Sequence, residues 1–142
     1  MTSRQSHAAA FLLLSLICTG IPRQAASFEL ITYGDSKDRT IGSDKYPDGY
    51  SAGANVTWSW SVSSGYWAVF FLDFDLDRGL DGYGDGDQLE ISDGYRTPRY
   101  HSARNPPVVP YRSRGSRLRI SFTTDSLTGD SAFRGFQLRV LL

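Results

Sequence analysis

The chain has 142 residues, which suits one domain, and its 15 lysine and arginine residues balance 15 aspartate and glutamate residues. This even charge argues against a protein that binds nucleic acids through its overall charge. Beyond the N-terminus, no segment approaches the run of about 18 apolar residues that a membrane span requires, so we expect no membrane-spanning segment there.

The N-terminus has the pattern of a secretory signal peptide. Arg4 precedes an apolar run of 11 residues, 8–18, which is too short to cross a bilayer. Cleavage after Ser27 suits the small residues before it. We therefore expect a signal peptide over residues 1–27 and one domain over residues 28–142, and we expect the protein to be secreted and extracellular. A buried N-terminal helix is the alternative.

Removal of the signal peptide would change the composition of the chain. Cleavage after Gly20 is a second option, but either site removes Cys18, the only cysteine. Loss of Arg4 and Arg23 by cleavage after Ser27 leaves 13 bases (15 less 2) against 15 acids, a net charge of −2. The mature domain would then depend on burial of its core without any disulfide.

Short β-prone segments follow, separated by residues typical of turns. We expect strands at residues 28–32, 55–61, 66–74, 87–92, 117–123 and 136–142. Residues 34–53 are rich in Gly, Asp, Ser and Tyr and are expected to form a connection. No amphipathic helix is evident after residue 27. The pattern predicts an all-β fold, an antiparallel sandwich.

Apolar and polar side chains alternate in most of these segments, which predicts one buried face for each strand. The segment 66–74 is more continuously apolar and is expected to be covered on both faces or nearly so. The aromatic residues are expected to fill the core rather than stack on a ligand. The expected inward positions are Val56, Trp58, Trp60, Phe71, Leu89, Ile91, Leu118, Ile120, Phe122, Phe136, Leu138 and Val140.

Acidic residues concentrate between Asp73 and Asp93, where eight acids face one base, Arg78. Calcium takes six to eight oxygen ligands, so carboxylates that converge from several segments could bind it. A solvated loop is the alternative. An EF-hand is disfavoured, because Arg78 stands where that motif needs glycine and Gly84 where it needs glutamate. Asp73 and Asp93 suit loop geometry and solvation.

Five motifs, in this order, resemble the CUB domain family. They are Gly-Ser-Asp-Lys-Tyr-Pro-Asp-Gly-Tyr at 42–50 with Asn-Val-Thr-Trp-Ser-Trp at 55–60, Val-Phe-Phe-Leu-Asp-Phe-Asp-Leu-Asp at 69–77, Asp-Gln-Leu-Glu-Ile-Ser-Asp-Gly at 87–94, Leu-Arg-Ile-Ser-Phe-Thr-Thr-Asp at 118–125, and Phe-Arg-Gly-Phe at 133–136. The resemblance covers residues 28–142. It implies two antiparallel sheets with jelly-roll-like topology, an extracellular location, and protein binding rather than catalysis.

The resemblance also implies a calcium site. Its ligands would be Asp77, Asp87 and Asp125, with a backbone oxygen of Ser126 or Leu127, and Tyr50 would support the carboxylates. Three carboxylates gathered at one end of a sandwich would repel one another, and a divalent ion removes that repulsion.

The chain departs from the family pattern in two ways. Asp77 stands where the family usually has glutamate, and the following loop is rich in glycine, so that Asp81 or Asp85 could substitute. The usual four cysteines are absent. Since losing a disulfide typically costs about 2–5 kcal/mol, a bound calcium ion would offset part of that loss.

The expected partner is an extracellular protein that presents a lysine or arginine to the acidic rim of the calcium site. A basic segment without acids between Asp93 and Asp125 offers an alternative, spermadhesin-like binding of glycans or sulfated polysaccharides through Arg112, Arg114, Arg117 and Arg119, within 96–119. Ordinary solvent-facing arginines would give the same pattern. The separation of acids from bases also permits self-association, and the chain could be a structural fragment of a longer multi-domain protein.

Enzymatic function is disfavoured. After residue 27 the chain has one histidine, His101, and no cysteine, so a cysteine nucleophile and a zinc site with two histidines are excluded there. Asn55-Val-Thr is a sequon, and Asn55 is a candidate for N-glycosylation in a secreted protein.

Overall fold

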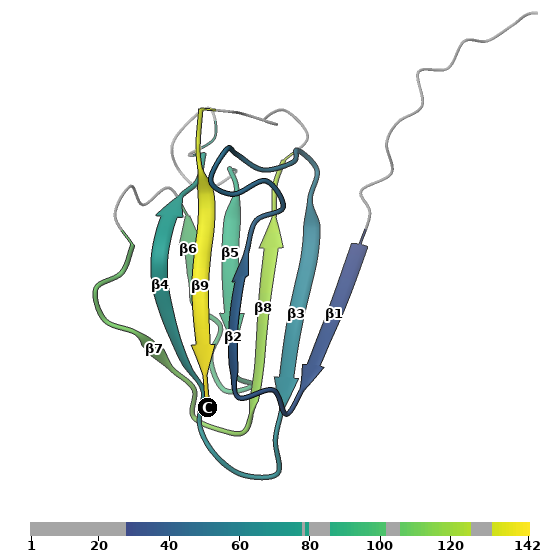
Figure 1. Cartoon of the computed structure of the whole chain (residues 1–142), viewed down its shortest axis with the longest axis vertical. Coiled ribbons are helices and arrows are strands. Elements are labelled where there is room, and N and C mark those ends of the chain that lie inside the picture. The colour runs from purple at the N-terminus through teal and green to yellow at the C-terminus, as the bar shows by residue number, and fades with distance from the viewer. Residues whose placement is uncertain (1–27, 78, 80–85, 102–105, 126–131) are drawn as a thin grey trace, which may run out of the picture.

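The computed structural model describes residues 28–77, 79, 86–101, 106–125 and 132–142. Within them, strands form two sheets, which confirms the expected all-β sandwich (Figure 1). One sheet has the order β1 (Phe28–Gly34), β3 (Asn55–Ser61), β8 (Arg117–Thr123), β5 (Gln88–Ser92) and β6 (Arg99–His101). The other has the order β2 (Asp38–Gly42), β9 (Gly135–Leu141), β4 (Ala68–Asp75) and β7 (Tyr111–Arg112). This part of the chain contains no helix with the length and apolarity needed to cross a bilayer.

Alternating apolar residues from both sheets form one core. In β8 and β9 every second side chain is buried, as the sequence predicts. Aromatic rings join the layers: the ring centroid of Phe136 lies 4.9 Å from that of Phe122 and 5.9 Å from that of Trp58, both in edge-to-face geometry. Burial of these large side chains is the main source of stability in a domain without disulfides.

Two strands differ from the sequence prediction. β2 lies inside the segment that was expected to be only a connection, because Ile41 alone among its five residues is buried and the apolar pattern is too short to detect. β4 is covered on one face rather than two. Phe70 and Leu72 are 37% and 51% exposed, because no described element packs on the outer face of the four-stranded sheet.

The sandwich is antiparallel except at one edge, where β1 pairs with β3 in parallel. After β1 the chain crosses to the other sheet, forms β2, and returns before β3, so the two neighbours run in the same direction (Figure 1). The short strands β6 and β7 were not predicted, since three and two residues give no periodicity.

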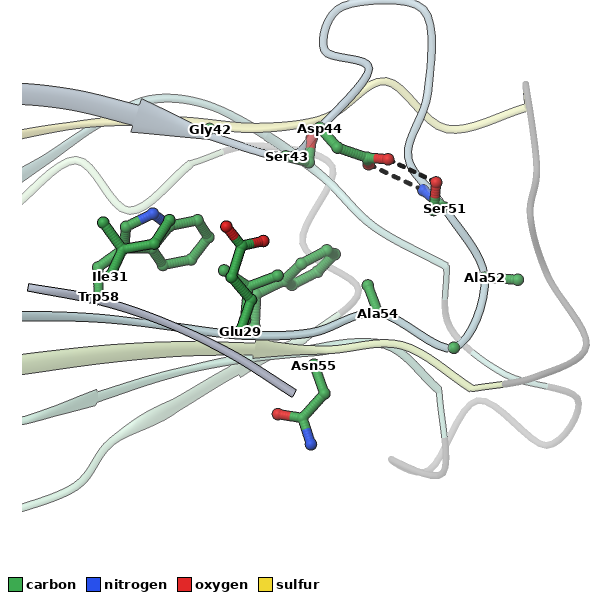
Figure 2. Close-up of a pocket in the computed structure, with 13 residues that line it drawn as sticks. Glu29, Ile31, Gly42, Ser43, Asp44, Ser51, Ala52, Ala54, Asn55 and Trp58 are labelled. Carbon is green, nitrogen blue, oxygen red and sulfur yellow. Dashed lines mark hydrogen bonds between the residues drawn. The ribbon is translucent and has the colours of Figure 1, made fainter. Parts of the chain in front are cut away.

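β1 and β2 lie at the same open edge of the sandwich, and the connection after β2 crosses between the sheets there. Asp44 holds this connection, because its carboxylate accepts hydrogen bonds from the backbone nitrogen of Ser51, at 2.9 Å, and from the Ser51 hydroxyl (Figure 2). Arg39 lies over the ring of Tyr33, with its guanidinium carbon 5.5 Å from the ring centroid, and so links β2 to β1.

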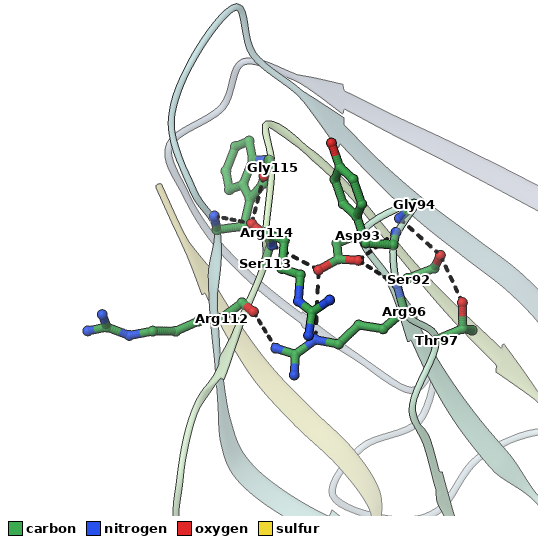
Figure 3. A network of polar contacts seen from close by, with 11 residues as sticks. Ser92, Asp93, Gly94, Arg96, Thr97, Arg112, Ser113, Arg114 and Gly115 are labelled. Carbon is green, nitrogen blue, oxygen red and sulfur yellow. Dashed lines mark hydrogen bonds and ion pairs between the residues drawn. The ribbon is translucent and has the colours of Figure 1, made fainter.

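Asp93 organises the turns at the end of β5. Its buried carboxylate accepts hydrogen bonds from the backbone nitrogens of Tyr95 and Arg96, both at 2.9 Å, and of Arg114, at 2.8 Å (Figure 3). Burial alone would raise the pKa of Asp93, but these backbone donors outweigh it and lower the pKa to about 2. Asp93 therefore has the role in loop geometry that its sequence position suggested.

Asp93 should make stability depend on pH in acid. Because the pKa is about 2 in the folded protein and near 3.8 in the unfolded chain, its contribution is present above about pH 4 and is lost as the pH falls toward 2. Denaturant unfolding of wild type and Asp93→Asn between pH 2 and pH 6 measures this contribution as the difference in unfolding free energy. The difference should be constant above about pH 5 and shrink below pH 4; parallel profiles throughout would contradict it.

Candidate functional site

Three acidic residues that are distant in sequence lie at one end of the sandwich. Asp77 follows β4, Asp87 precedes β5 and Asp125 follows β8. The antiparallel pairing of Gln88 with Thr123 places the start of β5 beside the end of β8, and β4 ends at the same pole of the molecule (Figure 1). The sheet topology therefore brings together the three carboxylate positions that the sequence singled out.

Asp87 is the central residue of this group. It is 0% exposed, and its Oδ1 accepts a hydrogen bond of 2.9 Å from the backbone nitrogen of Asp125. Its Oδ2 is buried and has no hydrogen-bond partner among the described residues. Burial raises the pKa of Asp87, interactions with the Tyr50 hydroxyl and the backbone nitrogen of Asp125 oppose this rise, and the negative charges of Asp125 and Asp77 add to it. One buried oxygen thus lacks the partner that buried polar atoms normally have.

Tyr50 connects two parts of the site. Its ring is buried and packs edge-to-face on Phe122, with ring centroids 5.5 Å apart. Its hydroxyl accepts a hydrogen bond of 2.9 Å from the backbone nitrogen of Asp77. Burial raises the pKa of the Tyr50 hydroxyl, and the carboxylate of Asp87 contributes to the same shift. Tyr50 therefore positions the backbone at Asp77, and its hydroxyl also interacts with the negatively charged carboxylate of Asp87.

The chain around Asp125 is fastened to the connection before β3. The carbonyl oxygen of Asp125 accepts a hydrogen bond of 2.7 Å from the backbone nitrogen of Gly53. The hydroxyl of Thr124 accepts one from the backbone nitrogen of Ala54, at 2.7 Å, and donates one to the carbonyl oxygen of Ser51, at 3.0 Å. These contacts hold the backbone at Thr124 and Asp125 against residues 51–54.

The described side chains do not complete a metal site. No three acidic, histidine or cysteine side chains in the described part of the chain are gathered closely enough to hold a metal ion. Asp77 instead accepts a hydrogen bond of 3.3 Å from the backbone nitrogen of Gly79. Asp81, Asp85 and Ser126, which the sequence named as further ligands or supporting residues, lie outside the described residues.

Other acids of the same run have structural partners. Asp73 forms a bidentate ion pair with Arg134, in which Nη2 of Arg134 lies 2.8 Å from Oδ1 of Asp73 and Nε lies 3.0 Å from Oδ2. The hydroxyl of Tyr46 donates a third hydrogen bond to Asp73, at 3.0 Å. The pKa of Asp73 is held below its usual value by Arg134 first and then by Tyr46. Asp73 therefore joins β4 to the start of β9 and is separate from the candidate site.

The four arginines named as an anionic-ligand patch lie on different surfaces. Arg117 and Arg119 are exposed side chains of β8, in the five-stranded sheet. Arg112 belongs to β7, in the other sheet, and Arg114 lies in the connection after it (Figure 3). The structure thus brings Arg117 and Arg119 onto one strand and separates them from Arg112.

Sequence reasoning did not single out Arg96 for a particular contact. Its guanidinium carbon lies 4.6 Å from the ring centroid of Tyr111, and its Nη2 donates a hydrogen bond of 2.6 Å to the carbonyl oxygen of Arg112. These contacts give Arg96 a structural role at the end of the sandwich opposite the carboxylates. No local sequence signal reveals this role, because both partners are distant in the chain.

Asn55, the sequon residue, is the first residue of β3 and is partly buried. Thr57, two residues on, is buried, and its hydroxyl is 2.9 Å from that of Ser121. Attachment of a glycan at Asn55 would therefore be easier before folding than after it.

Replacing Tyr50 with phenylalanine tests the contact that holds Asp77. The Tyr50→Phe variant leaves the backbone nitrogen of Asp77 without its acceptor, so we expect a loss of about 1–2 kcal/mol in unfolding free energy, measured by denaturant titration. Tyr66→Phe is the matched control, because Tyr66 is largely exposed and should change stability by less than about 0.5 kcal/mol. Equal stability of the two variants would contradict the contact.

Comparison with solved structures shows the same fold. The MASP-1 CUB2 domain bound to Ca²⁺ superposes with a TM-score of 0.67 at 20% identity, over 80% of this chain and 97% of that one. The CUB1-EGF-CUB2 domains of rat MASP-1 give 0.67 at 18% identity, over 79% of this chain and 42% of that one. The extracellular region of zebrafish Gpr126/Adgrg6 gives 0.64 at 18%, over 79% and 14%. This chain thus spans less than half of the latter two.

Comparison of sequences gives the family. No curated protein sequence matches the chain. The family model described as CUB domain matches residues 32–139, and this domain is a non-catalytic module. Since the match covers most of the chain and the two-sheet fold agrees with it, the chain belongs to the CUB domain family.

Proposed function

We propose that this protein is a secreted, calcium-dependent module that binds an extracellular protein partner. CUB domains are protein-interaction modules, often dependent on calcium, and are typically extracellular. Asp77, Asp87 and Asp125 hold the ion in this proposal, with Ser126 supplying a further oxygen. Their remaining negative charge engages a lysine or arginine of the partner.

The observation that carries the proposal is the buried Oδ2 of Asp87, which has no hydrogen bond to any described residue. A buried carboxylate oxygen without a hydrogen bond is unfavourable, and its cost is removed when a cation occupies the space beside it. Carboxylate oxygens are the ligands that calcium prefers. Asp77, Asp87 and Asp125 supply ligands of this kind, and the MASP-1 CUB2 domain, which has the same fold, is bound to Ca²⁺.

The electrostatics of the three acids point in the same direction. The negative charges of Asp125 and Asp77 both contribute to raising the pKa of Asp87, so each of them repels the Asp87 carboxylate. A divalent cation would turn this repulsion into attraction. Because residues 28–142 contain no cysteine, binding of an ion only to the folded state would also supply stability that disulfides give elsewhere.

The predicted signal peptide supports the same function. The N-terminal 27 residues have the charge and apolar run of a signal peptide, and the extracellular space supplies calcium for low-affinity sites. Tyr50 would hold the backbone at Asp77, so that the partner meets a rim of fixed geometry.

Binding of sulfated glycans remains a second candidate. Arg117 and Arg119 are both exposed on β8, and neither has an ion pair among the described residues, so both are available to an anion. Chelation separates the two functions, since EDTA should abolish binding of a protein partner at the carboxylates and spare binding of heparin at the arginines.

Calcium should raise the thermal stability of the protein. At a free calcium concentration 100 times the dissociation constant, the folded state gains about 2.7 kcal/mol, which raises the midpoint of unfolding by roughly 10 °C in a domain of this size. Melting curves with calcium and with EDTA measure the shift, and calorimetric titration measures the affinity. Asp87→Ala should remove both the heat of binding and the shift.

Asp35→Ala is the matched control, because Asp35 is an exposed acid in the turn between β1 and β2. It should bind calcium as the wild type does. If Asp87→Ala fails to fold, Asp77→Asn gives the same test. Identical midpoints in calcium and EDTA would exclude the proposed function.

A further inference from the structure

A cavity of about 580 Å³ opens between the two sheets at the edge formed by β1 and the connection after β2 (Figure 2). Glu29 and Ile31 of β1 form one side, and Asp44 and Ser51 form the other. Val56 and Trp58 of β3 also line the cavity. The cavity contains none of the three proposed calcium ligands, so it is a separate feature of the molecule.

The lining of this cavity combines apolar and acidic groups. Ile31, Val56 and Trp58 supply apolar surface, and Glu29 and Asp44 are the only charged residues among the described residues that line it. Asp44 is held at the rim by its hydrogen bonds to Ser51. A long side chain with an apolar stem and a positive end matches this combination, because the stem can be buried while the charge meets the carboxylates.

Glu29 is unusual among the side chains of β1. Alternation puts it on the same face as Ile31 and Tyr33, which pack against the core. Figure 2 shows the Glu29 carboxylate directed into the cavity. Glu29 has no ion pair or hydrogen bond to any other described side chain. Although Glu29 is exposed, its carboxylate on the cavity side of β1 would disfavour an apolar side chain that enters the cavity and favour a cationic one.

β1 is also the edge strand of its sheet, with β3 as its only neighbour among the described strands. Half of its backbone N–H and C=O groups face away from β3 and can pair with another strand. On the outer face of β1, Phe28 and Leu30 are 64% and 54% exposed, so a strand added here would find apolar side chains on one face and the cavity on the other.

We propose that this edge binds an extended peptide segment of a partner protein in which a lysine or arginine lies between two apolar residues. The segment pairs with the free edge of β1. Its cationic side chain enters the cavity and meets Glu29 and Asp44, while its apolar side chains pack on Phe28 and Leu30. A second copy of β1 cannot supply the cation, because residues 28–34 contain no lysine or arginine.

This binding is distinct from the calcium-dependent contact proposed above. Hydrogen bonds link the two sites where backbone groups of residues 51–54 pair with the backbone of Thr124 and Asp125 and with the Thr124 hydroxyl, and none of these bonds uses a carboxylate of Asp77, Asp87 or Asp125. The cavity itself is built from β1, β3 and the connection after β2. Peptide binding should therefore persist in EDTA, and its failure would leave the calcium proposal untouched.

Titration of the isotope-labelled protein with synthetic peptides, followed by amide chemical shifts, tests the proposal. The probe is acetyl-Val-Thr-Val-Lys-Val-Thr-amide, and two matched peptides carry norleucine or glutamate in place of lysine. The lysine peptide should shift amides of residues 28–33 and 51–55. The norleucine peptide should bind at least about fivefold more weakly, and the glutamate peptide more weakly still.

The Glu29→Gln variant should bind the lysine peptide about fivefold more weakly than the wild type does. Its affinity for the norleucine peptide should be unchanged, since only the lysine side chain meets the carboxylate. Asp48→Asn is the matched control, because Asp48 is an exposed acid of the same connection that does not line the cavity. It should bind the lysine peptide as the wild type does.

Three results would overturn the proposal. Equal affinity for the lysine and norleucine peptides would remove the role of Glu29. Shifts centred on Asp77, Asp87 and Asp125, or binding abolished by EDTA, would assign the cation to the carboxylate end. Concentration-dependent shifts at residues 28–33 without peptide would identify a second copy of the chain as the occupant.

Discussion

Burial of alternate side chains between two sheets is the interaction on which the rest of this molecule depends. Trp58, Phe122 and Phe136 come from three strands and meet in edge-to-face contacts across the sandwich. No disulfide can assist them, since the only cysteine lies in the predicted signal peptide. The end of β4, the start of β5 and the end of β8 lie together only because the two sheets pack on one another. The candidate site therefore forms only when the core forms.

The acidic residues show how environment gives one residue type several roles. Asp73 is neutralised by Arg134, and Asp93 is surrounded by backbone N–H donors, so each has its charge stabilised by fixed partners. Asp87 is as buried as Asp93, but one of its oxygens has no partner among the described residues, and the neighbouring carboxylates of Asp125 and Asp77 have the same charge. The distinction between a structural and a ligand-binding carboxylate therefore lies in whether its surroundings are complete.

Both proposals concern cations, but they use different physics. At Asp87 the proposed ion compensates desolvated and mutually repelling carboxylates, so binding is coupled to the stability of the fold. At β1 the carboxylates are exposed to solvent, and the apolar cavity and the free strand edge would supply much of the interaction. The first should therefore depend strongly on chelators and the second on the sequence of the partner segment.

The sequence by itself determined the six longer strands, most of the core positions and the family. β3 and β8 have the predicted bounds, and the predicted inward residues of β8 and β9 are buried, because alternation is a local property that any strand on a core must show. The tertiary structure decided the rest. The parallel partner of β1, the exposed face of β4, the unpaired oxygen of Asp87 and the cavity beside Glu29 each depend on which distant segments meet. Local patterns of apolar and polar residues do not encode those meetings, since they arise only when the two sheets close on one another.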